Sequence, residues 1–154
     1  MTKRILHATD FSSQAAGAAD EAIRLASALG AEVIVLHVAT EIVLYGETAF
    51  GMQQVKETYE EQARWAEARL AEMTRSIVDK GIRARWMRRV GLAHEEILKA
   101  ASEEEVDYIV LGTHGRGGVG RFMLGSVADR VIRRATCPVI TVRGHEAVTG
   151  EPGT

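Results

Sequence analysis

Short runs of β-branched and apolar residues alternate with longer segments of helical periodicity along the whole chain, and no other feature constrains the fold as strongly. Five of these runs are bounded by turn or capping residues and are predicted to be strands. They are residues 3–9, 31–38, 82–90, 106–112 and 137–143. Strands and helices in regular alternation predict right-handed crossovers and a parallel sheet with helices on both faces. The expected fold class is therefore α/β, a three-layer sandwich around a five-stranded parallel sheet.

The segments between the strands have the apolar spacing of amphipathic helices. Helices are predicted over residues 13–29, 53–80, about 92–103 and about 125–135. Ser12 is a candidate N-cap for the first helix and Gly30 follows its end, while Gly81 follows the end of the second. The first helix is expected to bury one stripe of apolar residues, Ala15, Ala18, Ala22, Leu25 and Leu29.

Two segments that follow strands determine the expected strand order. "ATDFS" (8–12) follows the first strand, and the glycine-rich "GTHGRGGVGRFMLGS" (112–126) follows the fourth. Open α/β sheets bind ligands beyond the carboxyl ends of the strands, at the point where the strand order reverses. The two segments can share such a site only if the first and fourth strands are neighbours, which gives the order 3-2-1-4-5. The third strand is expected at an edge because it carries four arginines, Arg83, Arg85, Arg88 and Arg89.

Length and charge exclude several classes of function. The 154 residues fit one domain, expected over 1–143, with a disordered tail over 144–154. A formal net charge of -2 gives no electrostatic case for a nucleic-acid partner. No apolar stretch approaches the roughly eighteen residues of a membrane span, and the N-terminus has no signal-peptide core. We therefore expect a cytoplasmic protein that does not contact membranes.

Two familiar glycine motifs do not fit the glycine-rich segment. Residues 115–120 have P-loop spacing, but Arg121 and Phe122 follow where a P-loop needs lysine and then serine or threonine. The same residues match the pattern G-x-G-x-x-G of dinucleotide-binding folds. However, they follow the fourth strand, they do not open the next helix directly, and Ile140 stands where an acidic ribose ligand is expected.

A third spacing fits better. Gly112 and Gly115 allow the backbone to wrap a ligand, and Gly125 and Ser126 begin a helix whose free amide groups and dipole favour an anion.

The chain resembles universal stress proteins of the nucleotide-binding class from end to end. The resemblance is carried by "ATDFS", "LHV", "GTHGRGG", "LGSVADRVIRRATCPVITV" and the order of the elements. It implies a site for ATP, ADP or AMP, with Mg²⁺ as a candidate companion of the phosphates. It places Asp10 near the ribose and the backbone of Ala8, Thr9 and Val38 around the adenine. The phosphates would lie on Gly112, Gly115, Gly125, Ser126 and Val127.

Structural roles are alternatives for several of these residues. Asp10 could instead cap the first helix, although Ser12 is available for that role. His114 and Arg116 could be solvated loop residues, or they could contact a phosphate, for which a guanidinium is well suited. Histidines in apolar strands, His7 and His37, are expected to be core residues. Trp65 and Trp86 are expected to be packing residues.

The sequence shows no catalytic constellation. It has no G-x-S-x-G elbow, and no motif marks a pair of carboxylates. The first hypothesis is therefore a nucleotide-binding regulatory or stress-response module with slow ATP hydrolysis at most. The alternatives are a slow ATPase or nucleotidyl transferase that uses His114 and Arg116, and a dimeric interaction scaffold without nucleotide.

The last strand is expected to mediate a homodimer. As an edge strand it offers Val139, Ile140 and Val142 with only Arg143 as a charged guard, so it is open to pairing with a second copy. The resemblance implies the same dimer.

Overall fold

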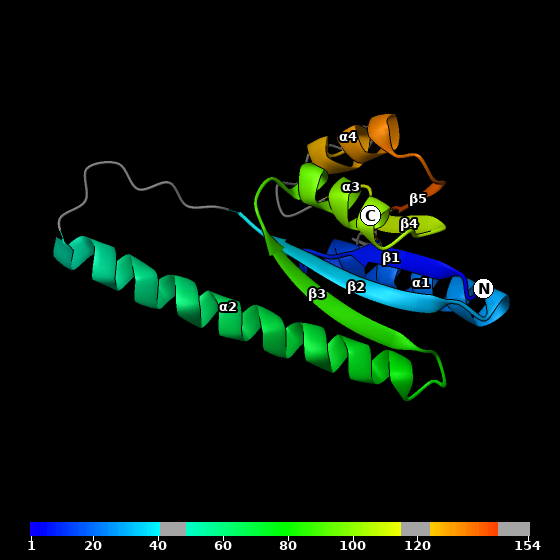
Figure 1. The fold of residues 1–154 in the computed structure, drawn as a ribbon, viewed down its shortest axis with the longest axis horizontal. Helices are drawn as coiled ribbons and strands as arrows, with labels where there is room; N and C mark the ends of the chain where they lie inside the picture. Colours follow the sequence, from blue (N-terminus) through cyan, green and yellow to red (C-terminus); the bar gives the residue numbers. More distant parts are fainter. Residues whose placement is uncertain (41–48, 115–123, 145–154) are drawn as a thin grey trace, which may run out of the picture.

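A computed structural model describes residues 1–40, 49–114 and 124–144 of the chain (Figure 1). The predicted tail beyond residue 144 lies outside the described residues. The elements in chain order are β1 (Arg4–Ala8), α1 (Ser13–Leu29), β2 (Glu32–Ala39), α2 (Ala49–Val78), β3 (Ala84–Val90), α3 (Ala93–Glu103), β4 (Tyr108–Gly112), α4 (Ser126–Arg134) and β5 (Val139–Val142).

The strands form one parallel sheet in the order β3-β2-β1-β4-β5, which confirms the predicted order and the edge position of β3. Leu6 in the central strand β1 is level with Ile34 of β2 and with Ile109 of β4. Figure 1 shows α3 and α4 together on one face of the sheet, and α1 and α2 cover the other. The predicted three-layer α/β sandwich is therefore correct.

A hydrophobic core lies on each face of the sheet because successive strand residues point to opposite faces. In β1, Leu6 packs into the core under α3 and α4, whereas Ile5 packs into the core under α1 and α2. Both side chains are completely buried. The alternation puts His7 on the same face as Ile5 and turns Ala8 toward α3 and α4.

Helix α1 has the predicted limits. The Ser12 hydroxyl accepts a hydrogen bond from the Ala15 N–H at 3.2 Å, and Gly30 ends the helix in the left-handed conformation with φ = 62°. The prediction that Leu29 is buried is wrong, since Leu29 is 42% exposed and Ala26 is buried in its place. Leu29 lies in the last turn, where the chain already leaves the sheet face.

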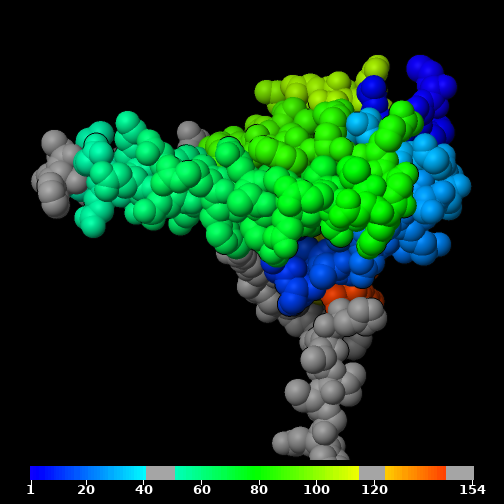
Figure 2. Space-filling model, turned by 90° about the horizontal axis from the view of Figure 1, so that it is seen from below, coloured from blue at the N-terminus to red at the C-terminus, as the bar shows by residue number. Residues whose placement is uncertain are grey.

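Helix α2 begins at Ala49 and ends at Val78, so it starts earlier than predicted. Its 30 residues span ~45 Å at 1.5 Å per residue, whereas the 7 residues of the neighbouring β3 span ~23 Å. Figure 2 shows the amino-terminal turns of α2 projecting past the rest of the molecule. Burial follows this geometry: Leu70 and Ile77 are buried, and Met52 is 56% exposed.

Both tryptophans are partly exposed. Trp65 is 52% exposed on α2, and Trp86 is 38% exposed on the edge strand β3. Trp65 is a packing residue, as expected, because it meets the Phe11 ring edge to face with the ring centroids 5.2 Å apart. Trp86 is exposed because no described strand pairs with the outer side of β3.

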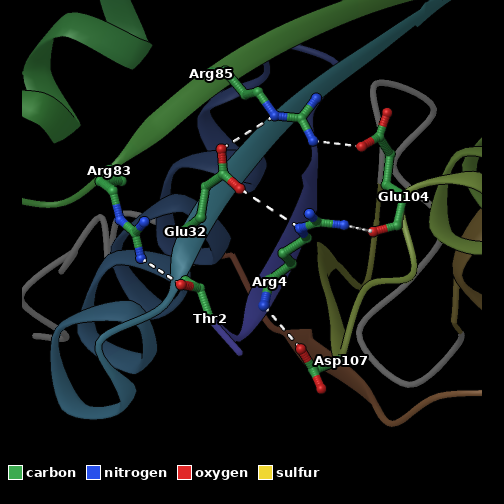
Figure 3. Close-up of polar contacts among 7 residues, drawn as sticks. All are labelled: Thr2, Arg4, Glu32, Arg83, Arg85, Glu104 and Asp107. Atoms are coloured by element: carbon green, nitrogen blue, oxygen red, sulfur yellow. Dashed lines mark hydrogen bonds and ion pairs between the residues drawn. The ribbon is translucent and has the colours of Figure 1, made fainter.

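A network of charged side chains joins the amino ends of the strands (Figure 3). Arg85 pairs with Glu32 at 3.1 Å and with Glu104, and Arg4 donates to the Glu104 carbonyl oxygen at 2.8 Å. The Asp107 carboxylate accepts a hydrogen bond from the Arg4 N–H at 2.9 Å. The network ties β1, β2 and β3 to the turn after α3, at the end of the sheet opposite to the cavity described below.

Among the described helices, none combines the length and the apolar character that crossing a bilayer requires.

Candidate functional site

A cavity of about 340 Å³ lies at the carboxyl ends of β1 and β4, where the strand order reverses. Its lining includes every described residue that was predicted for the site, namely Ala8, Thr9, Asp10, Val38, Gly112, His114, Gly125, Ser126 and Val127. Gly115 and Arg116 lie outside the described residues. The structure thus brings the two segments expected at the switch point into one cavity.

One end of the cavity is apolar, with Leu36, Ala93 and Ile97 in its lining. The pairing of β1 with β2 ends near this end, where the Thr9 N–H donates to the Leu36 carbonyl oxygen at 2.9 Å. Backbone groups alternate in direction along a strand, so the N–H and C=O of Val38 point to the same side as those of Leu36, past the end of β1. This end therefore suits a flat apolar ligand with a polar edge.

Asp10 lies between the two ends of the cavity. Its Oδ1 accepts a hydrogen bond from the Ser12 N–H at 2.9 Å, and Ser12 in turn caps α1 through the Ala15 N–H. The role of N-cap therefore belongs to Ser12, which leaves Asp10 as a wall of the cavity held in place by a local turn.

The other end of the cavity is formed by the start of α4. Gly125 is the N-cap residue and has no side chain that could accept from the first-turn N–H groups. The following residues, Ser126, Val127 and Ala128, all line the cavity. The Gly125 N–H donates to the Thr113 carbonyl oxygen at 2.6 Å, which fixes the helix start against the end of β4. Free amide groups and the positive end of the helix dipole favour an anion here.

Gly112 lines the cavity and lies close to the start of α1. A Cβ built on Gly112 would lie 3.4 Å from the Gln14 carbonyl oxygen and 3.8 Å from the Ala15 Cα, which are ordinary van der Waals contacts. Packing against α1 therefore does not by itself require glycine at this position.

The histidines have different environments. His7 is completely buried, as predicted, and its Nδ1 lies 3.2 Å from the Val110 carbonyl oxygen. Burial lowers the pKa of His7 from 6.5 to about 4, so it is neutral at pH 7. His37 is half-buried, with its Nδ1 2.9 Å from the Thr9 carbonyl oxygen. His114 lines the cavity, and its Nδ1 lies 3.0 Å from the Thr113 hydroxyl oxygen.

Sequence reasoning missed the contribution of α3 to the cavity. Ala93 and Ile97 lie four residues apart, on one side of this helix, and both line the cavity. Their apolar spacing is the same as that of any helix face packed on a sheet, so no signal in the sequence distinguishes them from core residues. Within the described parts of the chain, no three histidine, cysteine, aspartate or glutamate side chains gather into a metal site.

The model of the universal stress protein family matches residues 1–143. The chain belongs to the universal stress protein family. Among its relatives, universal stress protein MJ0577 from Methanocaldococcus jannaschii is 31% identical over 155 residues, covering 93% of this chain and 96% of the relative. YxiE from Bacillus subtilis is 34% identical over 148 residues, covering 93% of this chain and all of the relative.

Solved structures support the same fold for this family member. The structure of MJ0577 superposes with a TM-score of 0.79 at 30% identity, covering 96% of this chain and 99% of that one. Two further structures with this fold contain nucleotides. One is a universal stress protein in complex with cAMP (TM-score 0.63, 20% identity, covering 94% and 98%). The other is the Archaeoglobus fulgidus protein in complex with dAMP (TM-score 0.60, 24% identity, covering 93% and 98%).

Proposed function

We propose that this universal stress protein binds an adenine nucleotide, ATP, ADP or AMP, in the cavity between β1 and β4, and acts as a cytoplasmic regulatory or stress-response module. The observation that carries the proposal is the cavity of about 340 Å³ at the switch point, apolar at one end and bounded by a helix N-terminus at the other. A nucleotide has the same division between an apolar base and anionic phosphates.

The proposed placement follows this division. The base would lie against Ala8, Leu36 and Ile97, where the outward N–H and C=O of Val38 can pair with the polar edge of adenine. Asp10, next along the lining, would accept hydrogen bonds from the ribose hydroxyls.

The phosphates would lie on the start of α4. Ser126 and Val127 would receive them on backbone N–H groups, and Gly112, Gly115 and Gly125 would let the backbone approach the phosphates closely. A Mg²⁺ ion bound with the phosphates would take most of its ligands from phosphate oxygens and water, because the described residues offer no cluster of metal ligands.

Relatives support the class of ligand. Two proteins with this fold are known in complex with cAMP or dAMP, and both ligands are adenine nucleotides.

The cavity supports binding better than catalysis. Among its described lining residues, Asp10 and His114 are the only ones with titratable side chains. The sequence carries no nucleophile-elbow motif and no marked pair of carboxylates, so we expect a bound nucleotide to persist as a signal and ATP hydrolysis to be slow at most.

The first test is direct. Mass spectrometry of the denatured, purified protein identifies any nucleotide that copurifies, and a timed incubation with labelled ATP measures hydrolysis. A ligand at a hundredfold excess over its dissociation constant stabilises a protein by ~2.7 kcal/mol, which is expected to raise the melting temperature of a domain of this size by about 5–10 °C. Millimolar ATP, ADP and AMP that all leave the melting curve unchanged would contradict the proposal.

A matched pair of variants tests the phosphate end. Gly125 has φ = -60° and ψ = 155°, a conformation that both aspartate and asparagine adopt as N-caps. Gly125→Asp places a negative charge where the phosphates are proposed to bind, and Gly125→Asn is its neutral control. Both variants should fold with a stability within about 1 kcal/mol of the parent. Aspartate should weaken nucleotide binding by about tenfold or more relative to asparagine; equal affinities would exclude phosphates from the start of α4.

We further propose that two copies pair through β5. This strand is the edge of the sheet next to β4, and Val139, Ile140 and Val142 are all half-buried. The Pro138 carbonyl oxygen accepts a hydrogen bond from Ile109 of β4, and the Val142 carbonyl oxygen accepts one from Thr113, directly after β4. By alternation, the backbone groups of Val139 and Thr141 therefore point outward. A two-fold axis would let these groups pair with those of a second copy.

Thr141→Pro tests the dimer without removing a hydrogen bond to β4. Proline removes the outward N–H of residue 141 and is tolerated at sheet edges. Light scattering should give twice the 16.8 kDa monomer mass for the parent and the monomer mass for the variant. A monomeric parent, or a folded Thr141→Pro variant that stays dimeric, would exclude pairing through β5.

A further inference from the structure

Phe11 lies at the turn between β1 and α1 in an unfavourable backbone conformation. Its φ is 63°, in the left-handed region that side chains with a Cβ rarely adopt. Among the described non-glycine residues, Glu105 is the other one with a positive φ. A bulky residue keeps such a conformation only when its surroundings hold it there, and residues of this kind gather at ligand sites.

The surroundings of Phe11 supply that restraint from three segments of the chain. Its ring centroid lies 4.5 Å from that of His37 on β2 and 5.2 Å from that of Trp65 on α2, which it meets edge to face. The Phe11 N–H donates to the Thr9 hydroxyl at 3.0 Å, and the Nδ1 of His37 lies 2.9 Å from the Thr9 carbonyl oxygen. The aromatic contacts therefore stabilise the turn on its outer side.

The same turn separates two hollows in the surface. Thr9 and Asp10 line the cavity between β1 and β4, whereas Phe11 and Ser12 line a groove between α1 and α2. Thr9 lines both. Asp10 and Phe11 are adjacent, so a change in the backbone that moves the Asp10 carboxylate also moves the Phe11 ring.

We propose that Phe11 is a positioning residue for the nucleotide site and that its contact with Trp65 makes α2 respond to the bound nucleotide. This inference rests on the proposed function of the cavity. Phe11 holds the turn in the form that presents Asp10 to the ribose, and a nucleotide that contacts Asp10 shifts the ring against Trp65. Coupling of this kind is reciprocal, so loss of the aromatic contact weakens nucleotide binding.

Trp65 provides the spectroscopic signature. The chain has 2 tryptophans, and Trp86→Phe leaves Trp65 as the sole indole. Because Trp65 is 52% exposed, movement of the Phe11 ring changes its contact with solvent and hence its emission. ATP or AMP at saturation is expected to change the emission of Trp65, while equilibrium dialysis with labelled nucleotide measures affinity independently.

Two substitutions of Phe11 distinguish the ring from simple bulk. Phe11→Tyr keeps the ring and should retain both affinity and the Trp65 response. Phe11→Leu keeps an apolar side chain but loses the ring, so it should bind about tenfold more weakly and abolish the response. Circular dichroism establishes that each variant is folded.

The outcomes separate this inference from the function on which it rests. If the parent binds no adenine nucleotide in dialysis, both fail. If the parent binds nucleotide but Trp65 emission is unchanged at saturation, the inference alone is overturned, and this measurement needs no substitution at Phe11. A folded Phe11→Leu variant with parental affinity or a full Trp65 response also overturns it.

Discussion

His7→Leu should make the protein less sensitive to mild acid. His7 is completely buried, its Nδ1–H donates to the Val110 carbonyl oxygen, and its Nε2 has no hydrogen-bond partner among the described residues. Burial lowers the pKa of His7 from 6.5 to about 4, so the unfolded chain takes up this proton at a higher pH than the folded one. The folded state therefore loses stability as the pH falls below 6.5, and the loss is complete below the folded pKa of about 4.

The magnitude follows from the two pKa values. A pKa difference of about 2.5 corresponds to ~3.4 kcal/mol in total, of which about 2 kcal/mol is lost between pH 7 and pH 5. Leucine is of similar size and cannot take up a proton. Urea unfolding measures the free energy of unfolding of His7→Leu minus that of the parent at each pH. This difference should be about 2 kcal/mol more favourable to the variant at pH 5 than at pH 7.

Comparison with the parent cancels the other titrating groups, which both proteins share. A relative stability that is the same at pH 7 and pH 5 would refute the reasoning, as would an NMR titration in which the imidazole of His7 in the folded parent has a pKa near 6.5.

Three further substitutions test the packing and the charged network by urea unfolding. Gly30→Ala should cost about 1 kcal/mol because residue 30 has φ = 62°, and an unchanged stability would show that the helix end relaxes freely. The hydrogen bond from Arg85 lowers the pKa of Glu104, so Glu104→Gln should cost about 0.5–1 kcal/mol at pH 7 and progressively less as the pH falls below 4.5, where the unfolded chain takes up the proton first. Gly112→Ala should change the stability by less than about 0.5 kcal/mol, because the new Cβ makes only ordinary contacts, at 3.4 Å from the Gln14 carbonyl oxygen; a loss above about 1 kcal/mol would show that β4 and α1 cannot accommodate a methyl group.

The strand order could be predicted because two loop segments had to share one site. The motifs at 8–12 and 112–126 contain aspartate, serine and glycine, which are typical of turns and helix starts. These residue types mark the ends of the preceding strands in the sequence. Their placement in one cavity required only the rule that ligands bind at the switch point. The described residues predicted for the site come from these two segments and from the end of β2, and they all line the cavity.

Features that depend on how far one element extends over another could not be predicted. Apolar spacing identified the inward face of α2 but not that β3 is too short to cover it, so the exposure of Trp65 was missed. The wall formed by Ala93 and Ile97 was missed because apolar side chains look the same in sequence whether they face a core or a cavity. The conformation of Phe11 was not foreseen either, because phenylalanine carries no local signal for a positive φ.

The strand order also has a consequence for the order of events during synthesis and folding. The first 90 residues of the chain can form β1, β2 and β3. One edge of β1 stays unpaired until β4 is made about a hundred residues after β1, as the register of Leu6 with Ile109 shows. The cavity lies at the carboxyl ends of β1 and β4, so it depends on this late pairing. We therefore expect ligand binding to be the last property that the growing chain acquires and the first that it loses when β4 and β5 separate from the sheet. A ligand in the cavity would hold β4 and β5 against β1, β2 and β3.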